Sequence, residues 1–105
     1  MSNSFELYIE LLTAKRKASD LEKVASKLRR LANHNMSDEL NNVSKNWRSP
    51  NASKFLNKGT ALRERILAEA KSIENDAEII RRIAQRVYDS EMEALSIAKK
   101  RSYNG

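Results

Sequence analysis

The sequence predicts an all-α protein, an antiparallel two-helix hairpin that pairs with a second hairpin into a four-helix bundle. Gly is 2 and Pro is 1 in 105 residues, so few positions suit turns. Ala, Leu, Lys, Arg and Glu dominate, a composition typical of long helices. Apolar residues recur at seven-residue intervals on both sides of one central break. We therefore expect a single domain over 1–105, with helices over about 4–46 and 51–102 joined by a bend at 47–50.

The bend is predicted from Trp47-Arg48-Ser49-Pro50, which contains the only Trp and the only Pro. Pro50 lacks a backbone donor and disfavours the α conformation at Ser49, so the first helix should end here. Ser49 suits the N-cap position of a new helix, in whose first turn Pro is well tolerated. A connection this short favours antiparallel neighbours. Trp47 is expected to plug the closed end of the hairpin.

The first arm begins with the possible N-cap residues Ser2, Asn3 and Ser4. Its predicted apolar stripe has heptad steps such as Leu21 to Leu28. The stripe also takes in Phe5, Tyr8, Ile9, Leu12, Ala14, Ala18, Val24, Ala25, Leu31 and Ala32. Over 33–37 the residues are poor helix formers, and the stripe resumes displaced by about one position. We predict a stutter in one long helix, with a true break as the alternative.

The second arm has the clearer period. Seven-residue steps run without a gap from Ala52 to Ala94. Gly59 belongs to this row, and we expect it to make room for the ring of Phe55 or Trp47. The predicted packing seam of the two arms consists of Leu21, Leu28, Phe55, Leu62, Ile66, Ile73, Ile80 and Val87.

Some apolar residues fall outside this stripe, namely Leu11, Leu67, Ile79 and Leu95. A lone hairpin with solvated outer faces has no use for them. They indicate a second packing face, and hence a four-helix bundle built from two hairpins.

Composition also bounds the chemistry. The chain has no Cys and a single His, so no metal site, cofactor or catalytic set is expected, and the protein is predicted not to be an enzyme. The N-terminus lacks the pattern of a cleavable signal peptide. No apolar run approaches the roughly 18 residues of a membrane span. The net charge is +6, of which +3 lies in each half on either side of Pro50, a weak argument for a dedicated basic face.

Trp47-Arg48-Ser49 lies between two long heptad arms in a chain of about one hundred residues, with Ala52 and Phe55 five and eight positions after the Trp. This arrangement resembles the W-x-G family of small helical-hairpin proteins of Gram-positive type VII secretion, the early secreted antigen-like proteins, with Ser in place of the Gly. A second feature of that family is a Tyr followed four residues later by an acid. Here Tyr88 is followed by Met92 at that position, with Glu91 adjacent.

The resemblance implies a secretion substrate or adaptor. Its partners would be itself, as a homodimer, or a helical region such as the N-terminus of a larger secreted toxin, and then the type VII secretion ATPase. The chain would be cytoplasmic before export and would leave without a cleavable signal peptide. Trp47, Arg48 and Ser49 would form a recognition motif, and Tyr88, Glu91 and Met92 would mark the export-signal region.

Two other functions remain open. A pI of about 9.8 allows non-specific contact with nucleic acid, although acids are interleaved with the basic clusters and no nucleic acid is expected as partner. The third reading is a cytosolic coiled-coil interaction protein that is not secreted.

Overall fold

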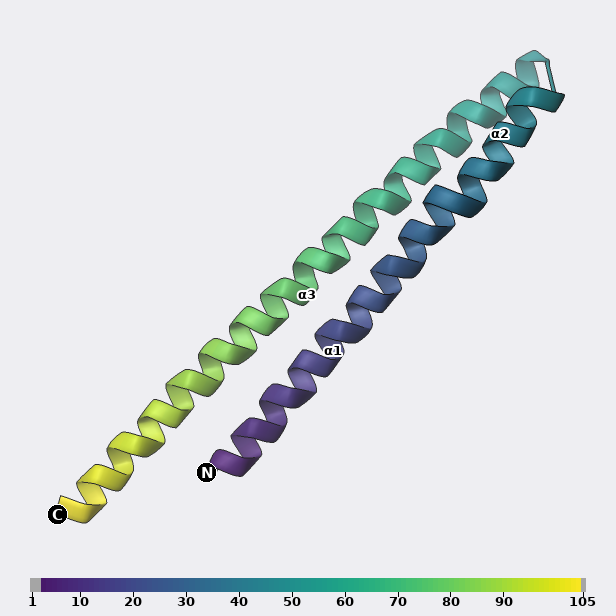
Figure 1. The fold of residues 1–105 in the computed structure, drawn as a ribbon. Helices are drawn as coiled ribbons and strands as arrows, with labels where there is room; N and C mark the ends of the chain where they lie inside the picture. The colour runs from purple at the N-terminus through teal and green to yellow at the C-terminus, as the bar shows by residue number, and fades with distance from the viewer. Residues whose placement is uncertain (1–2, 105) are drawn as a thin grey trace. The chain divides into compact units, whose positions relative to one another are not determined.

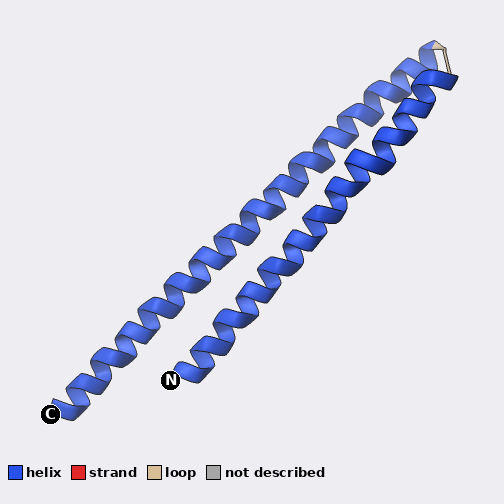
Figure 2. Cartoon of the chain, in the orientation of Figure 1, coloured by secondary structure: helices blue, strands red, loops and turns tan. Residues whose placement is uncertain are grey.

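The computed structural model describes residues 3–104, with side chains through Ser102, and these residues are almost entirely helical (Figures 1 and 2). Helix α1 spans Ser4–Arg30, a π-helical turn spans Leu31–Met36, α2 spans Ser37–Asn46 and α3 spans Pro50–Asn104. Within 3–104 there is no strand. The predicted all-α class is therefore confirmed.

The chain divides into two compact units. The first contains residues 1–20 and 76–105, and the second contains 21–75. The first unit thus joins the start of α1 to the later part of α3. The second holds the end of α1, the π-helical turn, α2, the bend and the beginning of α3.

Helix α1 begins with a side-chain cap. The Asn3 Oδ1 atom accepts a hydrogen bond from the backbone N–H of Glu6 at 2.8 Å, and Leu7 N–H donates to the Asn3 carbonyl at 3.0 Å. An amide side chain at this position satisfies one of the free donors at the helix start. Asn3 is therefore a capping residue as predicted, Ser4 is the first residue of the helix, and Ser2 lies outside the described residues.

The expected stutter is a π-helical turn. Helical structure runs without interruption from Ser4 to Asn46, so the alternative of a true break is wrong. A π-helical turn has wider hydrogen-bonded rings than an α-helix and accommodates one extra residue. That extra residue accounts for the one-position displacement of the apolar stripe on either side of 33–37.

The bend between α2 and α3 consists of 47–49. Trp47 N–H donates to the Val43 carbonyl at 3.0 Å, which completes the last turn of α2, and Trp47 itself is extended, with φ −131° and ψ 115°. Ser49 Oγ then accepts from Ala52 N–H at 3.1 Å. The predicted N-cap role of Ser49 is confirmed, and α3 starts at Pro50 as its residue type favours.

The buried core is built mostly from alanine. Its members are Leu7, Leu11, Ala18 and Ala77 in the first unit and Ala25, Ala32, Ala52 and Ala70 in the second. The prediction for the first turns of α1 was wrong: Leu11, expected off the stripe, is 6% exposed, whereas Phe5 is 70% exposed. The buried row runs at strict seven-residue spacing from Leu11 through Ala18, Ala25 and Ala32, and the last three of these were on the predicted stripe.

None of the helices in the described part of the chain is both long enough and apolar enough to cross a membrane.

Candidate interaction surface

Trp47 lies at the bend with about half of its side chain in solvent, at 46% exposure. Its ring packs against that of Phe55 in the first turns of α3, with centroids 6.2 Å apart and planes tilted by 51°. Such tilted pairs are favourable aromatic contacts. Phe55 is itself 49% exposed, so the pair ties α3 to the bend while leaving apolar surface uncovered. Arg48 is exposed, and Ser49 is half-buried by its capping role.

An apolar groove of about 570 Å³ lies beside this aromatic pair. One wall comes from the π-helical turn and α2, and the other from α3. Its lining is Leu31, Asn35, Met36, Glu39, Leu40, Phe55, Lys58, Gly59 and Leu62. Because Leu31, Phe55 and Leu62 are all more than 40% exposed, the groove is open to a partner.

Gly59 allows this approach of α2 to α3. A Cβ atom at position 59 would lie 2.5 Å from Leu40 Cδ2, so the missing side chain is what leaves room for Leu40. The expectation that Gly59 accommodates an aromatic ring was therefore wrong. Leu40 faces Gly59 because the π-helical turn displaces the apolar stripe of the residues that follow it. The sequence shows this displacement only as a shift in the spacing of apolar residues.

The side chain of Arg63, which extends from α3, is hydrogen-bonded to residues of the π-helical turn and to the first residue of α2. Its Nε donates to the Ala32 carbonyl at 3.0 Å and to Ser37 Oγ at 2.9 Å, and Nη2 donates to Asn33 Oδ1 at 2.8 Å. Ser37 Oγ donates in turn to the Ala32 carbonyl at 3.1 Å. One guanidinium thus fixes the turn that forms a wall of the groove.

Sequence reasoning missed Arg63, although a signal was present. Arg63 lies between Leu56 and Ala70 in a seven-residue row that continues through Ala77 and Ala84 before it reaches Glu91. A charged residue flanked by apolar members of such a row needs a hydrogen-bonding partner across the interface. The poor helix formers at 33–37 supply that partner.

A second cross-helix contact in the same unit joins Arg29 to Glu74. Arg29 Nε donates to Glu74 Oε2 at 3.2 Å, and Arg29 Nη2 donates to Glu74 Oε1, so the pair is bidentate. The hydrogen bonds from Arg29 hold the pKa of the Glu74 carboxyl below its usual value, and those to Glu74 raise the pKa of Arg29. Both side chains are 40% exposed, so solvent screens much of the attraction.

The predicted packing seam is only partly covered by the chain itself. Its half-buried members are Leu21, Leu28, Ile66, Ile73 and Ile80. Phe55, Leu62 and Val87 are exposed at 49%, 49% and 52%. Most of the buried residues in the described part of the chain, namely Leu11, Ala18, Ala25, Ala32, Ala70 and Ala77, lie on rows beside this seam, whereas Leu7 and Ala52 belong to the seam rows.

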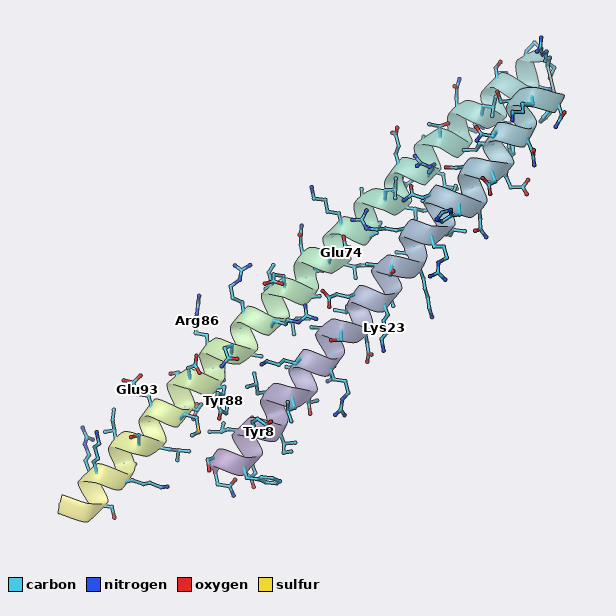
Figure 3. All side chains as sticks on the ribbon, in the orientation of Figure 1. Tyr8, Lys23, Glu74, Arg86, Tyr88 and Glu93 are labelled. Carbon is cyan, nitrogen blue, oxygen red and sulfur yellow. The ribbon has the colours of Figure 1, made fainter. Side chains whose placement is uncertain are left out.

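The predicted export-signal region lies in the first unit. Tyr88 is half-buried and lines a pocket of about 190 Å³ with Leu7, Leu11 and Val87, and Figure 3 shows it on the side of α3 facing α1. Met92, also half-buried, lines a separate pocket of about 330 Å³ beside Asn3 and Ser4. Glu91 is exposed, as are the nearby Arg86 and Glu93, which point away from α1 in Figure 3. Tyr88 and Met92 therefore do not share one pocket lining.

Within 3–104, no three His, Asp or Glu side chains gather where they would hold a metal ion. Comparison of the chain with protein families, curated proteins and solved structures finds no match.

Proposed function

We propose that this chain is a non-enzymatic type VII secretion substrate or adaptor, which folds as an antiparallel two-helix hairpin and pairs through its apolar faces. The observation that carries the proposal is the contrast between what the chain buries and what it exposes. Among the described residues, six of the eight buried apolar residues are Ala. In the same part of the chain, twelve large apolar side chains, Leu62 and Ile83 among them, are at least 41% exposed.

Burial energetics supports pairing. Hydrophobic stabilisation scales with the apolar area removed from water, at roughly 25 cal/mol per Å². An Ala side chain contributes little area, whereas Leu, Ile and Phe contribute most when they are covered. A chain that exposes its larger apolar side chains gains most of its hydrophobic stability when a partner covers them. Pairing of two hairpins into a four-helix bundle would do so.

The direction of the hairpin is supported by contacts within the 21–75 unit. Arg29 pairs with Glu74, Arg63 reaches 32–37, and Trp47 meets Phe55. Partners become closer in sequence toward the bend, as they do when two helices run in opposite directions from one turn.

The partner would be a second copy of this chain or the helical N-terminal region of a larger secreted toxin. The pair would then be delivered from the cytoplasm to the type VII secretion ATPase, without a cleavable signal peptide. Trp47 and Arg48, which are exposed, and the half-buried Ser49 would supply the recognition motif on the bend. Tyr88, Glu91 and Met92 remain the proposed export-signal region, altered from the family pattern by Met92.

Association is tested by sedimentation of the purified chain at tens of micromolar. We expect a dimer, and we expect Leu62→Gln with Ile83→Gln to shift it toward monomer because both side chains are exposed apolar groups. Thr60→Gln, an exposed change on the same helix, is the control. A wild-type chain that stays monomeric and also recovers no helical partner from its host would contradict the pairing.

Export is tested in the native host by measuring the chain in the medium. Trp47→Ala and truncation after Arg86 should each reduce secretion of the chain or its partner, whereas Trp47→Phe, which keeps an aromatic ring, should fold better than Ala. Met92→Ala should be mild. If the Trp47→Ala variant folds and pairs normally and is still secreted at the wild-type level, the tripeptide has only a structural role.

A further inference from the structure

The charge of this chain is concentrated in one unit. Residues 21–75 hold eleven basic and six acidic side chains, a net of +5, whereas the remaining residues hold nine and eight, a net of +1. Counting by sequence halves at Pro50 hides this difference, because the bend brings the two basic stretches on either side of it into one unit. The excess positive potential therefore belongs to the unit that contains Trp47.

Within that unit, 40–63 has five cations and no carboxylate. Arg63 is engaged by the π-helical turn. The other four are Lys45, Arg48, Lys54 and Lys58, all exposed, and their side chains make no hydrogen bond or ion pair with the described residues. We call these four the bend cations. They lie at the end of α2, in the bend and in the first turns of α3.

Exposed apolar groups lie among the bend cations. Trp47 and Phe55 are 46% and 49% exposed and pack on each other with centroids 6.2 Å apart. Behind them the groove continues with aliphatic side chains, including Leu40 and Leu62. The bend end thus combines a Trp, an aliphatic surface and uncompensated positive charge.

We propose that the bend end of the 21–75 unit binds the surface of an anionic lipid bilayer. Trp47 and Phe55 enter the headgroup region, where amphipathic rings are favoured, and the bend cations pair with lipid phosphates. Lys and Arg stems lie along the apolar boundary while their charged ends remain at the phosphates. This contact is peripheral and requires no spanning helix.

Charge complementarity alone would also suit nucleic acid, but the apolar surface favours lipid. Nucleic-acid surfaces use aromatic rings for base stacking and phosphate contacts for charge. They have no use for an aliphatic groove such as that formed by Leu40 and Leu62. A lipid bilayer offers both phosphates and an apolar phase at adjacent depths.

The test uses vesicles of phosphatidylcholine alone and of phosphatidylcholine with phosphatidylglycerol in equal amounts. Because Trp47 is the only Trp, its fluorescence reports the site directly. We expect a blue shift and quenching by lipids brominated near the headgroup with the anionic vesicles, weakening as salt rises. Equal binding to both vesicles, or an unshifted Trp47, would overturn the proposal.

The quadruple variant K45Q/R48Q/K54Q/K58Q should lower binding to the anionic vesicles on the order of a thousandfold. The matched control K15Q/R16Q/R82Q/R86Q removes four exposed cations from the other unit and leaves the same net charge, +2. It should lower binding less than tenfold, with helicity unchanged in both variants. Equal losses in the two variants would show that binding follows net charge alone.

Phe55→Ser should weaken vesicle binding while leaving all bend cations in place, and the retained Trp47 still reports. An unchanged affinity for this variant would overturn the apolar part of the contact. A duplex oligonucleotide is the competing probe at the same ionic strength. If the chain binds the duplex more tightly than the vesicles, and the quadruple variant loses this binding, the ligand of the bend end is nucleic acid and the lipid proposal is wrong.

Discussion

The Nε atom of Arg63 in α3 donates a hydrogen bond to the carbonyl oxygen of Ala32 at 3.0 Å, so a charged side chain from one helix closes a π-helical turn in another. The turn displaces the following residues around the helix axis. Met36 and Leu40 consequently line the groove opposite Phe55 and Leu62. Arg63 is thus a positioning residue for that groove.

Removing the guanidinium should loosen this turn. Arg63→Met keeps the aliphatic stem and deletes three hydrogen bonds, and we expect a loss of about 1–3 kcal/mol of unfolding free energy. Backbone amides over 31–37 should exchange faster with solvent. Urea unfolding and hydrogen exchange measure the two effects.

Arg65→Met is the matched control, because Arg65 is exposed two residues away. It should change stability by less than about 0.5 kcal/mol. Equal effects of the two substitutions would mean that the Arg63 contacts contribute no more than a surface charge.

The Arg29–Glu74 pair predicts a pH dependence. Because the pKa of Glu74 is lower in the folded chain than when unfolded, its contribution is fully present above the ordinary carboxyl pKa. It is lost as pH falls through the lowered value, where Glu74 becomes protonated. The stability difference between wild type and Glu74→Gln should therefore shrink on acidification from neutral pH, and also with added salt.

Urea titrations of both proteins from neutral pH to about pH 3 measure this difference. Glu64→Gln, which removes an exposed carboxylate from the same helix, serves as control. A difference that stays constant across the acidic range would show that the pair is not coupled to protonation of Glu74.

Gly59 and Leu40 are predicted to be energetically coupled. Ala has a helix propensity about 1 kcal/mol better than Gly, but the new Cβ would lie 2.5 Å from Leu40 Cδ2. Gly59→Ala in the native chain should therefore gain little or lose stability. In a Leu40→Ala background, where the obstructing atoms are absent, the same substitution should gain about 1 kcal/mol.

Thermal unfolding of the four proteins in this cycle gives the coupling free energy. The cycle requires each variant to remain helical, which circular dichroism checks. Additive effects would show that Leu40 moves aside at no cost.

The sequence predicted those features that depend on local chemistry. Helix class follows from composition, Asn3 and Ser49 cap as short polar side chains do, and Pro50 begins α3. The displaced stripe at 33–37 indicated a stutter. What the sequence did not show was its form, because a π-helical turn and a break give similar spacing.

Features that depend on which side chains meet were harder to predict. Phe5 and Ile9 were placed on the stripe, although Leu7 and Leu11 are the buried residues. Arg63 received no prediction, because its partners, Ala32, Asn33 and Ser37, lie on another helix. The concentration of charge around the bend was visible in the sequence, since 40–63 contains no carboxylate, but counting by halves at Pro50 concealed it.

The buried Ala row allows a last prediction about packing. Ala70 is 0% exposed, and Ala68, two residues earlier in α3, is exposed. Ala70→Leu adds three carbon atoms where the neighbouring helix leaves no solvent-accessible surface. It should cost about 1–3 kcal/mol through displaced side chains and backbone.

Ala68→Leu introduces the same atoms on the solvent side and should change the unfolding free energy by less than about 0.5 kcal/mol. The two substitutions differ little in helix propensity effect, so the comparison isolates packing. Urea unfolding of both variants measures it. If Ala70→Leu is as stable as Ala68→Leu, the Ala row does not set the distance between α3 and the helix beside it, and the exposure of the larger apolar residues would need another cause.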